Sequence, residues 1–230
     1  MNKKVFGGIG IVVIIIAVAM IMVFLMSTKD TNVNKNVLSI SDDYFKGTWC
    51  VAQRSGVAVT NEYFVFDENY VSDYRDSSEE AYMSSLYSII DSGMLSMSDV
   101  SKKFVIEAVS NNIVKLIDTD NKEVWSMLRC SGDGLDFDKF SASEIEGTWN
   151  VLFHGGQAVQ GETMLFDNGV FVDYRDGSTE PYLESTYEWT KNGHMLISKL
   201  DLEIEVFKTG NNSFGLIETD TGYIWEIEKE

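Results

Sequence analysis

Histidine, proline, cysteine and basic side chains are scarce in this chain of 230 residues. The only histidines, His154 and His194, are far apart in the sequence, which is more typical of turn or surface residues than of a metal or catalytic centre. No serine or cysteine lies in an activating motif, and no glycine-rich phosphate loop is present. The sequence therefore predicts neither an enzyme nor a protein with a metal or cofactor.

The shortage of basic residues also limits the partners. The chain has 18 Lys and Arg against 36 Asp and Glu, a net charge of -18. Residues 144–230 hold 17 acidic and 5 basic side chains, whereas residues 44–130 hold 13 and 8. Such a surface repels phosphate backbones and anionic lipid head groups, so nucleic-acid binding is not expected.

Charge is absent from one long stretch near the N-terminus. Val5–Met26 is apolar throughout and follows Lys3 and Lys4, which predicts one transmembrane helix with a cytoplasmic stub at residues 1–26 and residues 27–230 outside the cell. A cleaved signal peptide is the alternative, because Ala17-Val18-Ala19 supplies small residues at a suitable spacing. The apolar run continues beyond that point, which favours an uncleaved anchor over a secreted protein.

Two polar segments separate the remaining parts. Residues 27–43 are predicted to be a flexible tether, and residues 131–143 a linker. Asp133 and Glu144 stand at positions 1 and 12 of a possible calcium loop. Leu135 and Phe137 then fall at positions 3 and 5, where they cannot ligate calcium, so no such site is expected.

The rest of the chain is one sequence written twice. Residues 44–130 align with residues 144–230 without a gap, and 28 of the 87 pairs are identical. A repeat of this length is a whole small domain, since solenoid units are about 20–50 residues long. The chain therefore has two domains of the same fold.

Each repeat reads as β structure. There is one proline, and frequent turn signals such as Asp167-Asn168-Gly169 separate short runs of β-branched and aromatic residues. In the second repeat this predicts eight strands, at 147–154, 157–166, 169–175, 182–191, 194–200, 202–209, 213–219 and 223–229, with the same offsets in the first. The segment from Ser78 to Met83 has features of a helix start, but its counterpart contains Pro181, and we expect a loop followed by a strand.

Eight strands joined by hairpins can close into an antiparallel up-and-down barrel. Closure places the first strand beside the last, and Cys50 and Cys130 lie in those strands of the first repeat. If Trp49 and Trp125 point inward, both cysteines point outward, because side chains alternate along a strand. We therefore predict a disulfide between Cys50 and Cys130, which a domain outside the membrane is free to form.

The Gly-Thr-Trp motif at residues 47–49 and 147–149 resembles the start of the first strand in lipocalins and shorter bacterial lipocalin-like proteins. The resemblance implies two tandem lipocalin-like barrels. It also implies that Arg129 covers Trp49 and that Lys229 covers Trp149 at the closed end of each barrel, a favourable cation–π arrangement. These four residues would be structural.

The best candidate for a binding site is the Asp-Tyr-Arg-Asp motif, which is identical in both repeats. An inward-facing arginine could neutralise an anionic head group at the barrel mouth, with tyrosines around it. The candidate ligand-binding residues are Tyr74, Arg75, Tyr82, Tyr174, Arg175 and Tyr182. The alternative is a structural salt bridge to a neighbouring strand, and it is favoured, because the copies of a repeat keep folding residues as readily as functional ones.

Two functions follow from these expectations. The first is a membrane-anchored extracellular binding protein for a small amphipathic or apolar ligand, as the resemblance implies. The second is an interaction or structural module of the cell envelope that contacts another protein and whose barrels are filled with side chains. A continuous apolar pocket of about 300 Å³ or more would favour the first.

Overall fold

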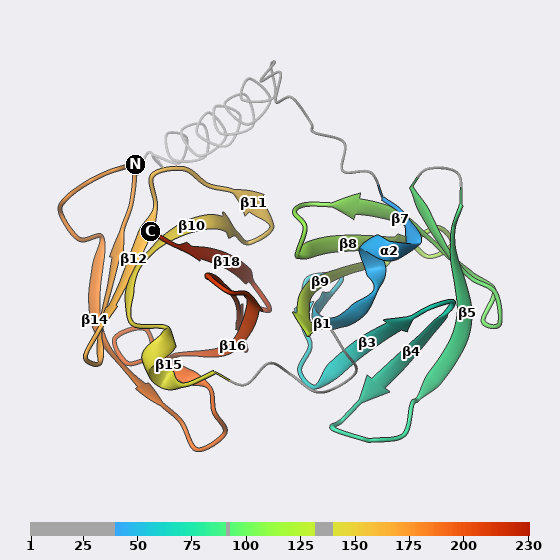
Figure 1. Ribbon diagram of the computed structural model, residues 1–230, viewed down its shortest axis with the longest axis horizontal. Coiled ribbons are helices and arrows are strands. Elements are labelled where there is room, and N and C mark those ends of the chain that lie inside the picture. Colours follow the sequence, from blue (N-terminus) through green and yellow to red (C-terminus); the bar gives the residue numbers. More distant parts are fainter. Residues whose placement is uncertain (1–39, 91–92, 132–139) are drawn as a thin grey trace, which may run out of the picture. The chain divides into compact units, whose positions relative to one another are not determined.

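The computed structural model describes residues 40–90, 93–131 and 140–230. The apolar stretch at 5–26, residues 27–39 of the tether and residues 132–139 of the linker lie outside these ranges, so the anchor stays a prediction. Among the helices of the described ranges, none has the length and hydrophobicity needed to cross a bilayer. The described chain is all-β and contains two antiparallel barrels (Figure 1).

The first barrel is a sheet of eight strands closed on itself. Its elements are α2 (Asp42–Phe45), β1 (Gly47–Arg54), β2 (Val57–Ala58), β3 (Glu62–Asp67), β4 (Tyr70–Arg75), β5 (Met83–Ile90), β6 (Met94–Met97), β7 (Lys102–Ala108), β8 (Ile113–Asp118) and β9 (Val124–Ser131). The two-residue strand β2 pairs with the end of β1 and is additional to the eight. Pairing of β1 with β9 closes the barrel, as the sequence predicted.

The second barrel repeats this topology. Its elements are the 3-10 helix η1 (Ala142–Glu144), β10 (Gly147–His154), β11 (Gln157–Ala158), β12 (Thr163–Asp167), β13 (Val170–Tyr174), β14 (Leu183–Trp189), β15 (Met195–Ile197), β16 (Leu202–Gly210), β17 (Ser213–Glu218) and β18 (Ile224–Lys229). Strand β10 pairs with β18 to close it. The short helices α2 and η1 begin in segments that were expected to be tether and linker.

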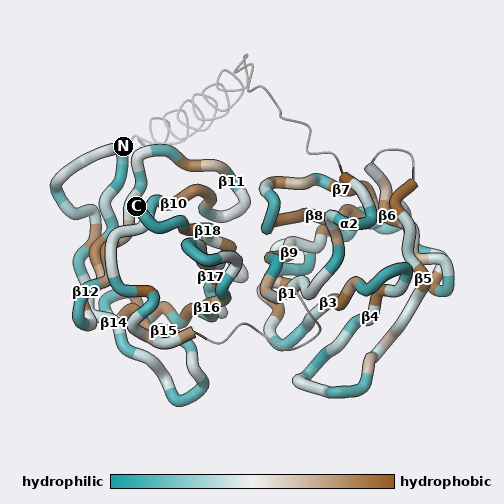
Figure 2. The backbone as a smooth tube through the Cα atoms, in the orientation of Figure 1, coloured by the Kyte–Doolittle hydropathy of each residue, from teal (hydrophilic) through white to brown (hydrophobic). Residues whose placement is uncertain are grey.

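Side chains alternate between the barrel interior and solvent, as the period of a strand requires. In β14, buried Ser185 and Tyr187 are interleaved with exposed residues. Figure 2 shows the resulting change between hydrophobic and hydrophilic residues along the strands. Each barrel has its own cluster of buried apolar side chains in its interior.

The single strand expected at 157–166 is divided in two. The chain leaves the sheet after β11 and re-enters it at β12, with Gly161 between them at a φ of +70°. A Cβ atom at Gly161 would lie 2.9 Å from the backbone nitrogen of Gly177, so this close approach requires glycine. By contrast, the expected loop before β5 is confirmed, since that strand begins at Met83.

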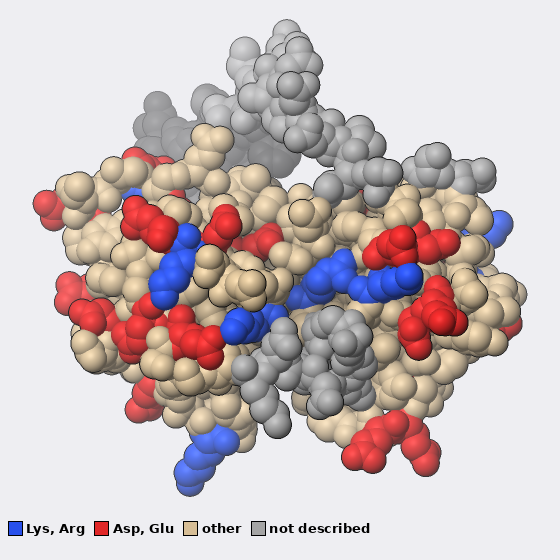
Figure 3. Space-filling view, viewed as in Figure 1, with Lys and Arg blue, Asp and Glu red and all other residues tan. Residues whose placement is uncertain are grey.

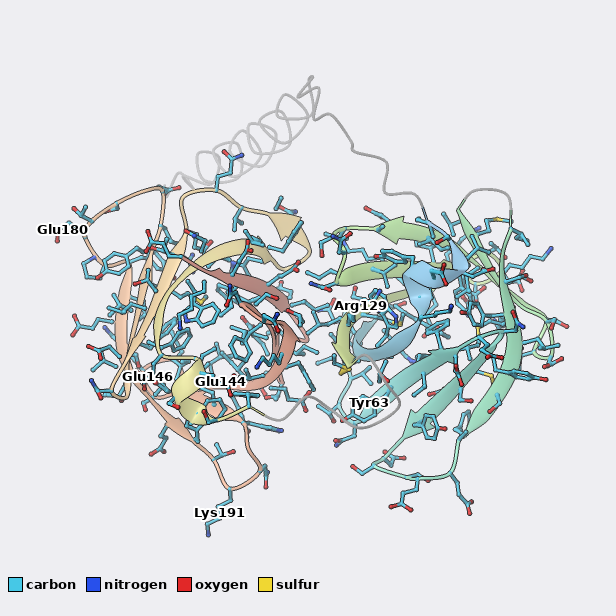
Figure 4. The ribbon with its side chains drawn as sticks, in the orientation of Figure 1. Tyr63, Arg129, Glu144, Glu146, Glu180 and Lys191 are labelled. Atoms are coloured by element: carbon cyan, nitrogen blue, oxygen red, sulfur yellow. A yellow bond between two sulfur atoms is a disulfide. The ribbon has the colours of Figure 1, made fainter. Side chains whose placement is uncertain are left out.

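One end of the first barrel is plugged by Trp49, which is fully buried. Its indole Nε1 donates a hydrogen bond to the carbonyl oxygen of Phe45 at 2.8 Å. The guanidinium of Arg129 lies 4.4 Å from the centre of the indole and donates to the carbonyl oxygens of Lys46 and Tyr44. Arg129 thus joins the last strand to the chain around α2 (Figure 4).

Trp149 plugs the second barrel in the same way. Its Nε1 donates to the carbonyl oxygen of Ile145 at 2.6 Å. Lys229 Nζ lies 5.1 Å from the indole centre and donates to the carbonyl oxygen of Glu146 at 3.0 Å. In both barrels the first and last strands therefore meet over a tryptophan.

The predicted disulfide between Cys50 and Cys130 is confirmed, with the Cα atoms 5.9 Å apart. The cysteines lie outside the interior core of the first barrel, in agreement with strand parity. They are nevertheless buried, at 2% and 1% exposure, because Ile217 and Ile224 of the second repeat belong to the same apolar cluster. The alternation of side chains along the strands of one repeat cannot predict that residues of the other repeat bury the cysteines.

Candidate functional site

The second barrel contains a cavity of about 560 Å³. Strand β10 runs from the plugged end, at Trp149, to the cavity mouth, at His154. The walls of the cavity are apolar and include Met164, Phe166, Phe171, Ile197, Ile204 and Leu216. Three residues of the mouth are largely exposed, namely Tyr182 at 66%, Leu200 at 52% and Tyr223 at 48%. The cavity is thus an apolar space with an aromatic and aliphatic rim.

Charged side chains occupy the equivalent end of the first barrel. Arg54 Cζ lies 4.2 Å from the centre of the Trp125 ring, and its guanidinium forms an ion pair with Glu62. Lys102 Nζ lies 2.6 Å from Asp118 Oδ2. In the second repeat the positions of these two cations hold His154 and Leu202. The cavity therefore lies where the two repeats differ.

The Lys102–Asp118 pair fixes the charge of that end. Burial disfavours the ionised form of Asp118. Hydrogen bonds from Lys102 and from the backbone N–H groups of Asp120 and Asn121 outweigh this effect and hold the pKa of Asp118 below its ordinary value. The carboxylate of the first barrel is thus ionised and paired.

In the second barrel, His154 lies flat on Trp225. The ring centroids are 3.5 Å apart and the planes differ by 19°. Trp225 Nε1 donates to Glu218 Oε1 at 2.9 Å, and Thr221 Oγ1 donates to Glu218 Oε2 at 2.6 Å. Burial lowers the pKa of His154 from its ordinary value, so the imidazole is neutral at pH 7.

Asp173 and Arg175 form the other polar part of the mouth. Arg175 Nε donates to Asp173 Oδ2 at 2.8 Å, and the guanidinium lies 4.0 Å from the centre of the Tyr182 ring. Asp173 is only 1% exposed, and its Oδ1 has no hydrogen-bond partner among the described residues. Glu162 Oε1 is likewise buried and unpartnered, 3.9 Å from both Arg175 Nε and His154 Nδ1.

The two acidic groups resist ionisation. Burial raises the pKa of Asp173, although the hydrogen bond from Arg175 acts in the opposite direction. Burial also raises the pKa of Glu162, and the neighbouring Asp173 raises it further. One nearby guanidinium thus does not compensate two buried carboxyl groups.

The structure brings some of the expected ligand-binding residues together. Arg175 and Tyr182 are stacked at the cavity mouth, and Arg75 and Tyr82 are stacked in the same way in the first barrel, at 4.0 Å. Tyr74 and Tyr174 follow the inward-facing Asp73 and Asp173 in their strands and point to the other face, so Tyr174 does not line the cavity. The salt bridge expected as the alternative for this motif is present, since Arg75 Nε lies 3.7 Å from Glu62 Oε1 of the neighbouring strand β3. Arg75 and Arg175 also pair with Asp73 and Asp173 within their own strands.

Other residues of the mouth were missed, chiefly His154, Glu162, Leu202 and Trp225. His154 was expected at a turn or surface, yet it packs on an indole. Identities between the repeats do not mark His154 or Leu202. The useful signal was the opposite one, namely a Lys or Arg of the first repeat that has an uncharged counterpart in the second.

The second histidine lies elsewhere. His194 Nδ1 is 3.0 Å from Glu203 Oε1, and its Nε2 is 3.6 Å from Glu205 Oε1. Across residues 40–90, 93–131 and 140–230, no group of three or more His, Cys, Asp or Glu side chains is placed to hold a metal ion.

No known family model, curated protein or solved structure matches this chain. What the site can do must therefore be argued from its chemistry. An apolar space of this size accepts a small molecule, and buried acceptor oxygens at its mouth favour a ligand with a polar or charged head.

Proposed function

We propose that this is a binding protein, anchored in the cell membrane by residues 5–26, which takes up a small amphipathic ligand in its second barrel outside the cell. The cavity of about 560 Å³ carries the proposal. It falls within the range of ligand pockets, about 300–1,000 Å³, and its walls are mainly apolar with few polar groups at the mouth. These properties suit a molecule with an apolar body and a polar end.

The asymmetry between the repeats supports a division of roles. Arg54 and Lys102 take up space at the mouth of the first barrel, where His154 and Leu202 stand in the second. On this proposal, the second barrel binds the ligand. The first barrel, with its disulfide, contributes to a stable ectodomain.

Native mass spectrometry tests this function. The full chain is extracted from its host membrane without detergent and compared with His154→Arg/Leu202→Lys, which restores the side chains of the first barrel. Val170→Tyr, which restores Tyr70 at an exposed position outside the cavity, is the matched control. We expect a small molecule of defined mass on the wild type and on the control, and none on the double variant.

The opposite result is equally clear. A wild-type chain that carries no bound molecule, with the same spectrum as the double variant, would contradict ligand binding. The outer surface would then be the working part, as in an envelope interaction module.

A further inference from the structure

The two barrels keep the same three carboxyl positions at the mouth or directly beside it, but not the same cations. The carboxyl groups are Glu62, Asp73 and Asp118 in the first barrel and Glu162, Asp173 and Glu218 in the second. The first barrel sets Arg54, Arg75 and Lys102 against them. In the second barrel, Arg175 is the one Lys or Arg among the described residues that line the cavity. On formal charges, that mouth has a deficit of two cations.

In the first barrel, Lys102 supplies one of the cations that the second barrel lacks. Its side chain is an alkyl stem that ends in an ammonium group, and Nζ contacts Asp118 Oδ2 at 2.6 Å. Leu202 stands at the same position in the second repeat and lines the cavity. The first barrel thus contains, as part of its own chain, an alkylammonium that the second lacks.

Two buried oxygen atoms lack donors at this place. Asp173 Oδ1 and Glu162 Oε1 are both buried and without a hydrogen-bond partner, as is Asp73 Oδ1 in the first barrel, and of these three residues Asp173 lines the cavity. Arg175 engages only the other oxygen of Asp173. Because an unpaired buried acceptor is destabilising, a ligand that brings N–H donors gains more here than one that brings acceptors. An ammonium group has three donors and a positive charge.

We propose that the second barrel binds an organic ammonium cation, with the ammonium group at Asp173 and an alkyl tail against the apolar walls. This inference rests on the proposed function and specifies its ligand class. The acidic surface in Figure 3 is consistent with it, since a cation is attracted and an anion repelled. Arg175 stays paired with Asp173 Oδ2, and the ligand takes Oδ1.

Three probes with the same tail separate the charge from the hydrophobic contribution. Hexylamine, hexanol and hexanoate are titrated near neutral pH into the full chain in nanodiscs of zwitterionic lipid, by calorimetry, and empty nanodiscs give the lipid background. We expect hexylamine to bind at least about tenfold more tightly than hexanol, and hexanoate to bind most weakly.

Two variants test the position of the ammonium group. Leu202→Lys introduces the tethered ammonium of the first barrel, and it should weaken hexylamine binding at least about tenfold. Asp173→Asn removes the charge with little change of shape and should reduce the preference for hexylamine over hexanol. Val170→Tyr, which restores Tyr70 of the first repeat at an exposed position outside the cavity lining, should leave both unchanged. Circular dichroism and the urea midpoint establish that each variant is folded.

The outcomes distinguish this inference from the function beneath it. If hexanol or hexanoate binds as tightly as hexylamine, or if Leu202→Lys binds hexylamine unchanged, the cation assignment is overturned while ligand uptake stands. If none of the three probes binds and native mass spectrometry shows no bound molecule, both are overturned.

Discussion

The imidazole of His154 lies on the indole of Trp225 with ring centres 3.5 Å apart, at the position where Arg54 covers Trp125 in the first barrel. The same tryptophan is therefore covered by a cation in one repeat and by a neutral ring in the other. This substitution, together with that of Lys102 by Leu202, distinguishes the two barrel mouths.

The stack predicts acid sensitivity in the second barrel. The pKa of His154 is lowered by burial, so the folded state binds fewer protons than the unfolded chain in this range. The contribution of neutral His154 to the free energy of unfolding is therefore complete above the pKa of histidine in the unfolded chain, about 6.5. It is lost as the pH falls below that value. His154→Phe keeps the stack and removes this loss.

The measurement is the free energy of urea unfolding of the second barrel between about pH 8 and pH 5, with the two proteins compared at each pH. The difference should be small at the upper end and should favour His154→Phe increasingly at the lower end. Parallel curves would contradict a buried neutral imidazole. The groups that face His154, namely Glu162, Asp173, Arg175 and Glu218, are the same in both proteins.

For Glu162, we expect the free energy of unfolding to change with pH in the opposite direction. Its pKa is raised by burial, so the folded state holds the proton longer than the unfolded chain. Ionisation therefore removes stability as the pH rises through the raised pKa, and Glu162→Gln avoids this cost. We expect Glu162→Gln to be more stable than wild type at pH 7, with the difference disappearing near pH 4 and below.

The same variant should bind hexylamine more weakly, because it removes an acidic group beside the ammonium site, 3.9 Å from Arg175 Nε. A gain in stability with a loss of binding is the pattern of a site that is strained without its ligand. Glu180→Gln, at an exposed loop position, is the control. A Glu162→Gln protein that is less stable at pH 7 would show that Arg175 compensates the carboxylate fully.

The disulfide makes a prediction that depends on the loop it closes. Cys50 and Cys130 are separated by 80 residues, and in the chain-entropy model a loop of this length stabilises the fold by about 4.5 kcal/mol. Cys50→Ala/Cys130→Ala should lose a large part of this from the first barrel. Hydrogen exchange through the urea transition, followed by mass spectrometry on peptides of each barrel, would separate the two barrels.

Burial of both cysteines adds a kinetic expectation. They lie in an apolar cluster with Ile217 and Ile224, so a reductant should reach them slowly in the folded protein and rapidly in urea. Intact mass after alkylation measures the rate. Rapid reduction in the absence of urea would show that the cluster opens easily.

Local pattern was enough for the parts of the fold that depend on one repeat. Strand parity and an even strand count predicted that Cys50 meets Cys130, and both statements concern neighbours in a single sheet. The break at Gly161 was missed because Gly161 was read as part of the strand, although it lies in the polar run Gln160-Gly161-Glu162, where a turn is favoured. The covering of the cysteines was missed because it comes from the other repeat.

The site was harder to predict because it is a cavity, and a cavity has no sequence motif of its own. A motif such as Asp173-Tyr174-Arg175 draws attention by its charges, and Arg175 does lie at the mouth. The cavity, however, results from the smaller or neutral side chains of Leu202 and His154, which carry no motif. A comparison of the repeats position by position identifies both, since the counterparts are Lys102 and Arg54.

The last prediction concerns the tryptophan plug of the first barrel. Trp49 is fully buried, donates to the carbonyl oxygen of Phe45 and lies under Arg129. Trp49→Ala should lower the free energy of unfolding of that barrel by about 3–5 kcal/mol, because it leaves a large cavity and removes the support of Arg129. Tyr70→Ala, at an exposed position of β4, should change it by less than about 0.5 kcal/mol.

Hexylamine binding by Trp49→Ala and Trp149→Ala separates the structural role of each tryptophan from an effect on the ligand site. The hexylamine cavity belongs to the second barrel, so Trp49→Ala should bind hexylamine as the wild type does under conditions where both barrels are folded. Trp149→Ala should lose stability and hexylamine binding together, because Trp149 plugs the barrel that contains the cavity. A Trp49→Ala protein of wild-type stability that no longer bound hexylamine would assign the ligand to the first barrel instead.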